Sequence, residues 1–222
     1  MHKNFRKNRK TVRQILNHHF DRFGKCDRIK MLASHLKMST LFFEKKDEEK
    51  TMIPERLAAL REKMRAYGVD AYLVPTADYH ESEYVGTYFK ARTYITGFTG
   101  SAGTAVITQD EACLWTDGRY FVQAAKELAG TGVTLMKMGQ EGVPTVEEYL
   151  AANTKEGMTI GFDGRVVNEM LGEALEKTLP ERFLSYRSDL IGEIWSDRAA
   201  LSAEPVWILD AKDTGESAAE RL

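Results

Sequence analysis

The sequence predicts an α/β fold in which helices cover a β-sheet on both faces. Short apolar runs of strand length alternate along the chain with segments of helical periodicity, which is typical of this fold class. Two β-rich runs, 103–108 and 112–116, are separated by a polar turn at 109–111 and predict a hairpin. The second of these runs is apolar at every second position on both of its faces, so it favours a strand buried under helices.

This second run is expected to be a central strand of the sheet. Ala112 and Leu114 point to one face in a period-two pattern, while Cys113 and Trp115 point to the other. Asp117 and the glycine after it end the strand and open an amphipathic segment.

A helix and a strand are expected before the hairpin. The helix lies between Pro54 and Gly68, because proline suits a first helical turn and glycine ends a helix. Apolar residues recur at helical spacing between them at Leu57, Leu60, Met64 and Tyr67. The strand covers 71–74 and ends at Pro75.

After the hairpin, strands and helices continue to alternate. The amphipathic segment 120–128 is expected to be a helix. Further strands are expected at 134–138, 159–163 and 182–186, and further helices at 144–152 and 168–179. The sequence past Trp195 turns polar, and residues 203–222 are expected to be a connector followed by the truncated start of a second domain.

Two stretches raise the possibility of a ligand site, and in both the structural interpretation is favoured. One is Asp78-Tyr79-His80-Glu81-Ser82-Glu83-Tyr84, which crowds potential metal ligands but lacks the H-E-x-x-H spacing. The other holds Gly97, Gly100 and Gly103, whose G-x-x-G-x-x-G order differs from the nucleotide-binding patterns. A close-packed turn explains the glycines better. Nucleophilic catalysis by Ser101 has no downstream histidine as a base.

The junction between the buried strand and the following helix collects four functional candidates. Trp115, Asp117, Arg119 and Tyr120 are expected to surround this corner, with Asp117 able to cap the helix. Arg119 would then lie at a helix start, where the helix dipole disfavours a cation unless it has an acidic partner. An internal salt bridge and an intermolecular contact are both compatible with this position.

Several ordered motifs resemble the N-terminal domain of cytosolic-type Xaa-Pro aminopeptidases, in the creatinase and prolidase superfamily. They are D-Y-H-E-S-E-Y, then G-F-T-G-S-A-G-T-A-V-I-T, then L-W-T-D-G-R-Y-F-V-Q-A-A, L-M-K-M-G and I-W-S-D-R. The similarity covers residues 53–207. It implies a creatinase N-terminal domain over 52–202, with a mixed sheet in a ribonuclease H-like arrangement.

The resemblance also implies what this chain does not carry. Peptidase chemistry in the superfamily belongs to a C-terminal domain that binds two metal ions, usually manganese, through two Asp, one His and two Glu. All five histidines here lie at or before His80, so the sequence predicts no catalytic residue, no metal ligand and no cofactor in this chain. First-domain residues of the superfamily approach the partner's active site, and the matching candidates here are Arg119, Tyr120, Trp115, Asp117, Arg92 and His80.

The first 51 residues differ in character from the rest. Residues 1–50 hold 14 lysines and arginines against 6 acidic residues, while the remainder holds 17 against 27. We expect an atypical basic leader that is disordered or results from a mis-assigned start site. A transit peptide and a nucleic-acid-binding arm are the alternatives, the latter without an accompanying recognition fold.

Composition fits a cytoplasmic protein with an ordinary core. The chain has 43% hydrophobic residues and no apolar stretch long enough to cross a membrane. Its two cysteines, Cys26 and Cys113, are not expected to pair, which favours a reducing compartment.

Three function classes follow. The first is the non-catalytic N-terminal domain of an Xaa-Pro aminopeptidase, which contributes to a homodimer and to active-site access. Its partners would be its own catalytic domain and proline-containing peptides. The second is a stand-alone binding protein of the same fold, and the third is a nucleic-acid binder that uses the basic leader.

Overall fold

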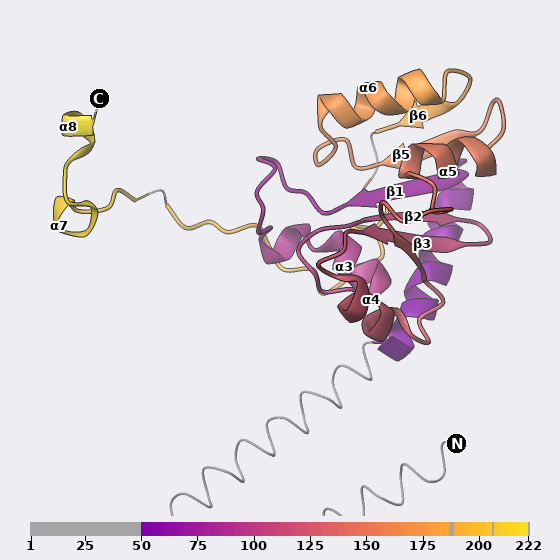
Figure 1. The fold of residues 1–222 in the computed structure, drawn as a ribbon, viewed down its shortest axis with the longest axis horizontal. Helices are drawn as coiled ribbons and strands as arrows, with labels where there is room; N and C mark the ends of the chain where they lie inside the picture. The colour runs from indigo at the N-terminus through magenta and orange to yellow at the C-terminus, as the bar shows by residue number, and fades with distance from the viewer. Residues whose placement is uncertain (1–49, 187–188, 206, 222) are drawn as a thin grey trace, which may run out of the picture. The chain divides into compact units, whose positions relative to one another are not determined.

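The computed structural model describes residues 50–186, 189–205 and 207–221. The chain divides into a unit of residues 1–51 and a unit of residues 52–222. The predictions for the basic leader, including those for Cys26, lie outside the described residues. The second unit holds a six-stranded mixed sheet flanked by helices (Figure 1), so the predicted fold class is confirmed.

The elements alternate along the chain much as the periodicity predicts. In chain order they are a helix over residues 50–67, β1 (Ala71–Pro75), η1 (Thr87–Phe89), α3 (Ala91–Thr96), β2 (Thr104–Thr108), β3 (Ala112–Thr116), α4 (Phe121–Leu128), β4 (Thr134–Lys137), α5 (Val146–Asn153), β5 (Thr159–Phe162), α6 (Glu169–Thr178), β6 (Phe183–Ser185), α7 (Ala211–Thr214) and α8 (Ala218–Arg221).

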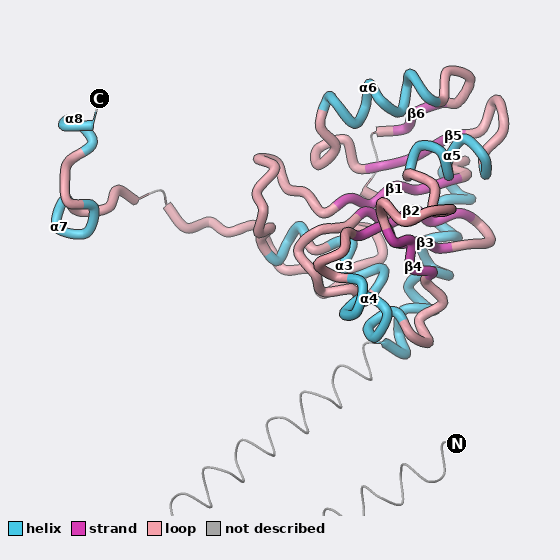
Figure 2. The backbone as a smooth tube through the Cα atoms, viewed as in Figure 1, coloured by secondary structure: helices cyan, strands magenta, loops and turns pink. Residues whose placement is uncertain are grey.

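The strands lie side by side in the order β4-β3-β2-β1-β5-β6, as Figure 2 shows. β2 runs antiparallel to both β1 and β3, and the other neighbouring pairs are parallel. The predicted hairpin is therefore confirmed. β3 is an interior strand, although it lies one position from the edge of the sheet and not at its middle.

One face of the sheet is covered by the helix over 50–67 together with α3 and α4 (Figure 1). The apolar side of the first helix packs here because its buried residues recur every three to four positions. The buried side chains of this core include Ile53, Leu60, Met64, Tyr72, Ile95, Phe98, Ile107 and Leu114.

The other face is covered by α5 and α6 (Figure 1). Its core contains Leu73, Val106, Cys113, Trp115, Tyr149, Leu150, Ile160, Phe162, Leu175 and Leu179. All five residues of β3 are buried, with alternate side chains in the two cores, as the sequence pattern predicts.

The helix starts on this second face are fixed by local hydrogen bonds. Thr145 and Glu148 form a capping box at α5, in which each side chain accepts from the other residue's backbone N–H. Asn168 caps α6 by accepting from the backbone N–H of Leu171 at 2.8 Å. These caps set helix starts two or fewer residues from the expected positions.

The short helical segments η1, α3 and α7 have no counterpart among the helices expected from the sequence. α3 occupies Ala91–Thr96, in the stretch that leads into the glycine-rich turn, and ends at Gly97 in the left-handed conformation (φ 77°). Six residues are too short for a helical period to stand out in the sequence.

In the described residues 199–205 and 207–210, the chain forms no helix or strand before α7. Large apolar side chains here face solvent, with Trp207 73% exposed and Ile208 87% exposed. The boundary expected at residues 202 and 203 and the start of a second domain stay predictions.

Candidate functional site

A tight turn joins β3 to α4 at the predicted corner. The Asp117 side chain accepts from the backbone N–H of Arg119 at 3.0 Å, and the Asp117 carbonyl accepts from that of Tyr120 at 3.0 Å. Tyr120 is the N-cap residue of α4, and no side chain caps this helix. The prediction that Asp117 caps the helix is therefore wrong, because its carboxylate closes the turn three residues earlier.

Arg119 finds its acidic partner within the same turn. Its Nε lies 2.9 Å from one carboxylate oxygen of Asp117 and its Nη2 lies 2.9 Å from the other. This hydrogen bonding lowers the pKa of the Asp117 carboxyl and raises that of the guanidinium. The Arg119 side chain remains 64% exposed, so the pair orients the guanidinium without burying it.

The same D-G-R turn recurs after β5. Arg165 contacts Asp163 through Nε at 2.9 Å and Nη2 at 2.8 Å, as Arg119 contacts Asp117. Since β3 and β5 run in the same direction, both turns lie at the same end of the sheet. Arg165 also contacts Asp189 at 3.0 Å, and it therefore ties two loops together. The sequence signal for this second turn is the D-G-R triplet, which follows each of the two strands at 117–119 and 163–165.

Beneath the first corner, Arg92 holds the glycine-rich loop from inside the protein. Its guanidinium donates to the carbonyl of Phe98 at 2.5 Å, to the carbonyl of Gly100, and to the hydroxyl of Thr76 at 2.9 Å. Arg92 is only 3% exposed, and burial lowers its pKa to about 10. These contacts give Arg92 a structural role, while its predicted contact with a substrate or second subunit stays a prediction.

The glycine-rich loop is packed against the corner. The hydroxyls of Ser101 and Tyr120 are 2.7 Å apart. A Cβ at Gly100 would lie 2.3 Å from the ring of Phe98 and 2.8 Å from that of Tyr120. No other residue fits this position without movement of the two rings, so the sequence interpretation as a close-packed turn agrees with the structure.

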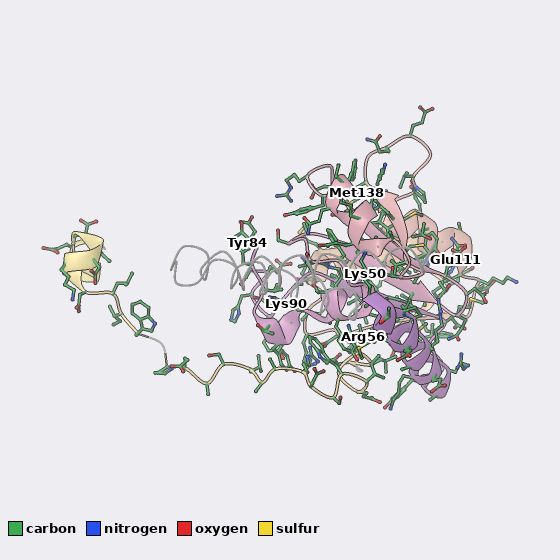
Figure 3. The ribbon with its side chains drawn as sticks, turned by 90° about the horizontal axis from the view of Figure 1, so that it is seen from below. Lys50, Arg56, Tyr84, Lys90, Glu111 and Met138 are labelled. Carbon is green, nitrogen blue, oxygen red and sulfur yellow. The ribbon has the colours of Figure 1, made fainter. Side chains whose placement is uncertain are left out.

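A second loop, with the sequence D-Y-H-E-S-E-Y, approaches the corner from β1. Asp78 organises it by accepting from the backbone N–H groups of His80 at 2.8 Å and Ser82 at 3.0 Å. These bonds lower the pKa of Asp78. His80 is exposed, and Tyr84 is 77% exposed and projects from the protein (Figure 3).

The chain that leads from β1 into this loop is bonded to the glycine-rich loop, because the backbone N–H and the hydroxyl of Thr76 donate to the carbonyl of Gly103 at 3.0 and 2.8 Å. The pKa of Tyr84 is raised, mainly by the charge of Glu83 and its hydrogen bond. Tyr120 raises it further, and the positive charge of Arg119 opposes the shift. Glu83 in turn contributes to the raised pKa of Arg119. Residues 78–84, the glycine-rich loop and the corner thus form one surface, which we call the corner site. Nothing in the sequence except the family resemblance placed Glu83 and Tyr84 in it.

Trp115 is the candidate that the structure does not bring to this site. It is 1% exposed, lies in the core under α5, and donates from Nε1 to the carbonyl of Pro144 at 2.8 Å. Its ring packs edge-to-face on Tyr149, with centroids 5.0 Å apart. Trp115 is therefore a core residue next in sequence to the corner, on the face opposite α4.

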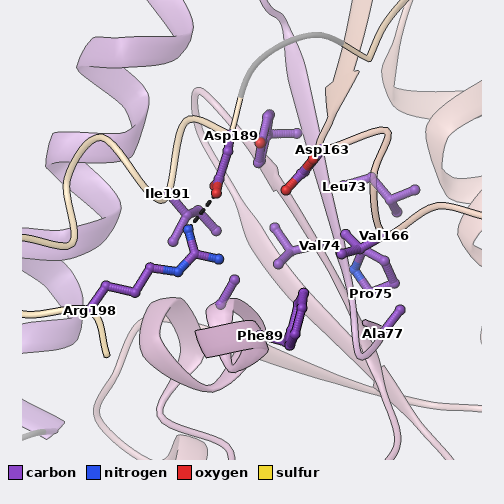
Figure 4. A pocket seen from close by; sticks show the side chains of 12 residues that line it. Leu73, Val74, Pro75, Ala77, Phe89, Asp163, Val166, Asp189, Ile191 and Arg198 are labelled. Carbon is purple, nitrogen blue, oxygen red and sulfur yellow. Dashed lines mark hydrogen bonds and ion pairs between the residues drawn. The ribbon is translucent and has the colours of Figure 1, made fainter. Parts of the chain in front are cut away.

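A small cavity lies where the loops after β1, β5 and β6 meet. It measures about 20 Å³, enough for about one water molecule, and Figure 4 shows Asp163 and Asp189 on its wall. Arg198 pairs with Asp189 there and donates to the carbonyl of Tyr88 at 2.8 Å. The cavity is a junction between loops and is too small for a substrate.

Among the described residues, no group of three or more His, Cys, Asp or Glu side chains could hold a metal ion. The part of the chain that the structure describes therefore does not fit a two-metal centre.

Comparison with known families identifies the fold. Residues 56–194 match the model of the creatinase/prolidase N-terminal domain, so the chain belongs to this family. Within it, the chain is similar to Xaa-Pro aminopeptidases, as the sequence motifs indicated. It is 39% identical over 185 residues to aminopeptidase P2 of Arabidopsis thaliana, covering 80% of this chain and 26% of that protein.

Further relatives agree. A probable Xaa-Pro aminopeptidase P of Talaromyces marneffei is 42% identical over 172 residues, covering 76% of this chain and 26% of the relative. The crystal structure of X-prolyl aminopeptidase from Caenorhabditis elegans, described as a cytosolic enzyme with a di-nuclear active site, superimposes with a TM-score of 0.68 at 36% identity. That match covers 76% of this chain and 29% of the worm enzyme. The chain thus spans between a quarter and a third of these relatives' length.

No helix in the described part of the chain is both long enough and apolar enough to span a bilayer.

Proposed function

We propose that this chain is the N-terminal domain of an Xaa-Pro aminopeptidase, and that it contributes to dimerisation and to active-site access without performing the cleavage. The complete cytoplasmic enzyme would remove an N-terminal residue that precedes proline, using two manganese ions held outside this domain. Its partners are the catalytic domain, a second subunit and proline-containing peptides, with neither membrane nor nucleic acid among them.

The observation that carries the proposal is the corner site. Three segments distant in sequence meet there, residues 78–84, 97–103 and 117–120. Hydrogen bonds within the segment order the first and the third, while the glycine-rich segment is held by bonds from Arg92 and to Tyr120. A surface needed only for solubility would not require such ordering, whereas a binding surface gains from side chains that are fixed before contact.

Arg119 is the residue on which we base the test. Its planar guanidinium is oriented by Asp117 and more than half of the side chain is still exposed. Exposed ion pairs contribute only about 0–1 kcal/mol to stability, so this pair is not explained by the needs of the fold. Arginine is well suited to contact a carboxylate, whether of a peptide or of an acidic side chain in a partner subunit.

The experiment compares Arg119→Ala with Arg165→Ala in a complete Xaa-Pro aminopeptidase that carries this domain. Arg165 is the matched control because it lies in the equivalent D-G-R turn after β5 but also forms an ion pair with Asp189. Dimerisation, melting temperature and kcat/KM are measured together.

We expect Arg119→Ala to reduce activity or dimerisation at an unchanged melting temperature, and Arg165→Ala to lower the melting temperature first. If Arg119→Ala lowers only the melting temperature, Arg119 has a structural role alone, and the result counts against the proposal.

A further inference from the structure

Glu81 has an unusual backbone conformation. Among the residues that the structure describes, it is the one non-glycine residue with a positive φ, at 56°. A side chain in this left-handed region is strained and persists only where the surroundings impose it. Glu81 lies in the middle of residues 78–84, one of the three segments of the corner site.

Two sets of contacts impose this conformation. On one side, the carboxylate of Asp78 holds the backbone N–H groups of His80 and Ser82, which flank Glu81. On the other side, the amide Nδ2 of Asn168 donates to Oε1 of Glu81, across 87 residues of sequence. The loop is thus clamped through its backbone by Asp78 and through its middle side chain by Asn168.

Asn168 performs two tasks with one side chain. Its Oδ1 accepts from the backbone N–H of Leu171 and caps α6, while its Nδ2 faces Glu81. The amide group supplies both an acceptor and a donor, which neither aspartate nor serine can do in the same geometry. Capping alone would be served equally well by aspartate.

We propose that Asn168 is a positioning residue for the corner site: through Glu81 it fixes the loop that carries Glu83 and Tyr84. The functional importance of this positioning rests on the proposed function of the corner site. The contact between Glu81 and Asn168 acts as a latch, since Glu83 and Tyr84 lie two and three residues after the constrained Glu81.

The test exchanges donor and acceptor in the 222-residue chain. Asn168→Asp keeps the cap of α6 but places a carboxylate against Glu81, so the latch is lost. Glu81→Gln keeps an acceptor for Asn168, and the double variant Glu81→Gln with Asn168→Asp restores one hydrogen bond with the donor now on residue 81.

Amide hydrogen exchange of residues 80–84 is the readout. We expect exchange there to rise by at least about tenfold in Asn168→Asp and to stay near wild type in Glu81→Gln and in the double variant, at an unchanged melting temperature. Unchanged exchange in Asn168→Asp, or no recovery in the double variant, would overturn the latch.

A second readout separates the latch from the proposed function. In a complete enzyme carrying this domain, Asn168→Asp is expected to change KM or dimer affinity, with recovery in the double variant. If exchange follows the latch while KM and dimerisation remain unchanged, the latch stands as a structural device and its role in positioning the corner site is wrong. If Arg119→Ala is also without effect, the proposed function itself fails.

Discussion

The guanidinium of Arg92 donates a hydrogen bond to the main-chain carbonyl of Gly100, eight residues further along the chain. Through this bond and the one to Phe98, a buried arginine takes the place that backbone hydrogen bonding would fill in a helix or strand. Gly100 lies between Arg92 below and the ring of Tyr120 beside it, so the irregular loop has a fixed shape.

Replacing Gly100 with alanine should therefore destabilise the protein. The added Cβ would meet Phe98 at 2.3 Å and Tyr120 at 2.8 Å, both in packed rings, and we expect a loss of about 1–3 kcal/mol. Gly118→Ala is the matched control, because its Cβ would meet nothing closer than 3.9 Å. Urea unfolding of both variants checks this, and equal stabilities would show that the rings can move aside.

The hydrogen bonds that order residues 78–84 should depend on the pH of the solution. Backbone hydrogen bonds from Ser82 and His80 lower the pKa of Asp78 below its ordinary value of 3.8. A carboxyl whose pKa is lowered by folding stabilises the folded state at any pH above its pKa in the unfolded state. This contribution is lost as the pH falls through the pKa of the carboxyl in the folded state.

We therefore expect the amides of His80 and Ser82 to remain protected at pH 5 and to lose protection only below pH 3.8. An NMR titration of the Asp78 carboxyl and of both amides measures this. Asp78→Asn is the control, since it retains an acceptor that does not titrate. Loss of protection above pH 5 in the wild type would contradict the assignment.

Removing residues 1–51 should leave the second unit intact. The core of this unit uses residues from Ile53 onward, so we expect the free energy of unfolding to change by less than about 1 kcal/mol. Chemical denaturation of residues 52–222 beside the full chain measures the difference. An unfolded truncated protein would show that the leader is structural.

The 222-residue chain should release no amino acid from an Xaa-Pro peptide, with or without added manganese. A two-metal site needs several carboxylates and usually a histidine around one cavity, and the last histidine of the chain is the exposed His80. A peptidase assay on pure protein tests this. Hydrolysis that a chelator abolishes would refute it.

The sequence predicted the sheet better than the site. β3 could be recognised because burial on both faces leaves a period-two pattern of apolar residues in five positions. The turn formed by Asp117 and Arg119 could not be recognised from the sequence, because an aspartate in the same local sequence can either cap a helix or close a turn. Trp115 appeared to belong to the site because it is near in sequence, whereas its strand directs it to the other face.

Contacts between distant segments lay outside the reach of pattern reasoning. No periodicity links Glu81 to Asn168, or Arg92 to the carbonyl of Gly100. Such contacts depend on how loops meet once the sheet has formed, and a single sequence carries no signal for them.

The strand order has a consequence for how the chain folds. Strands β1 to β4 come from one continuous stretch, residues 71–137, whereas β5 joins them by pairing with β1 across nearly ninety residues, as Ala71 opposite Ile160 shows. Closing that long loop costs more chain entropy than forming the hairpin does. We expect the β1–β4 half to assemble first and the β5–β6 half to dock late. In native-state hydrogen exchange the strand amides of β5 and β6 should then open at lower free energy than those of β2 and β3.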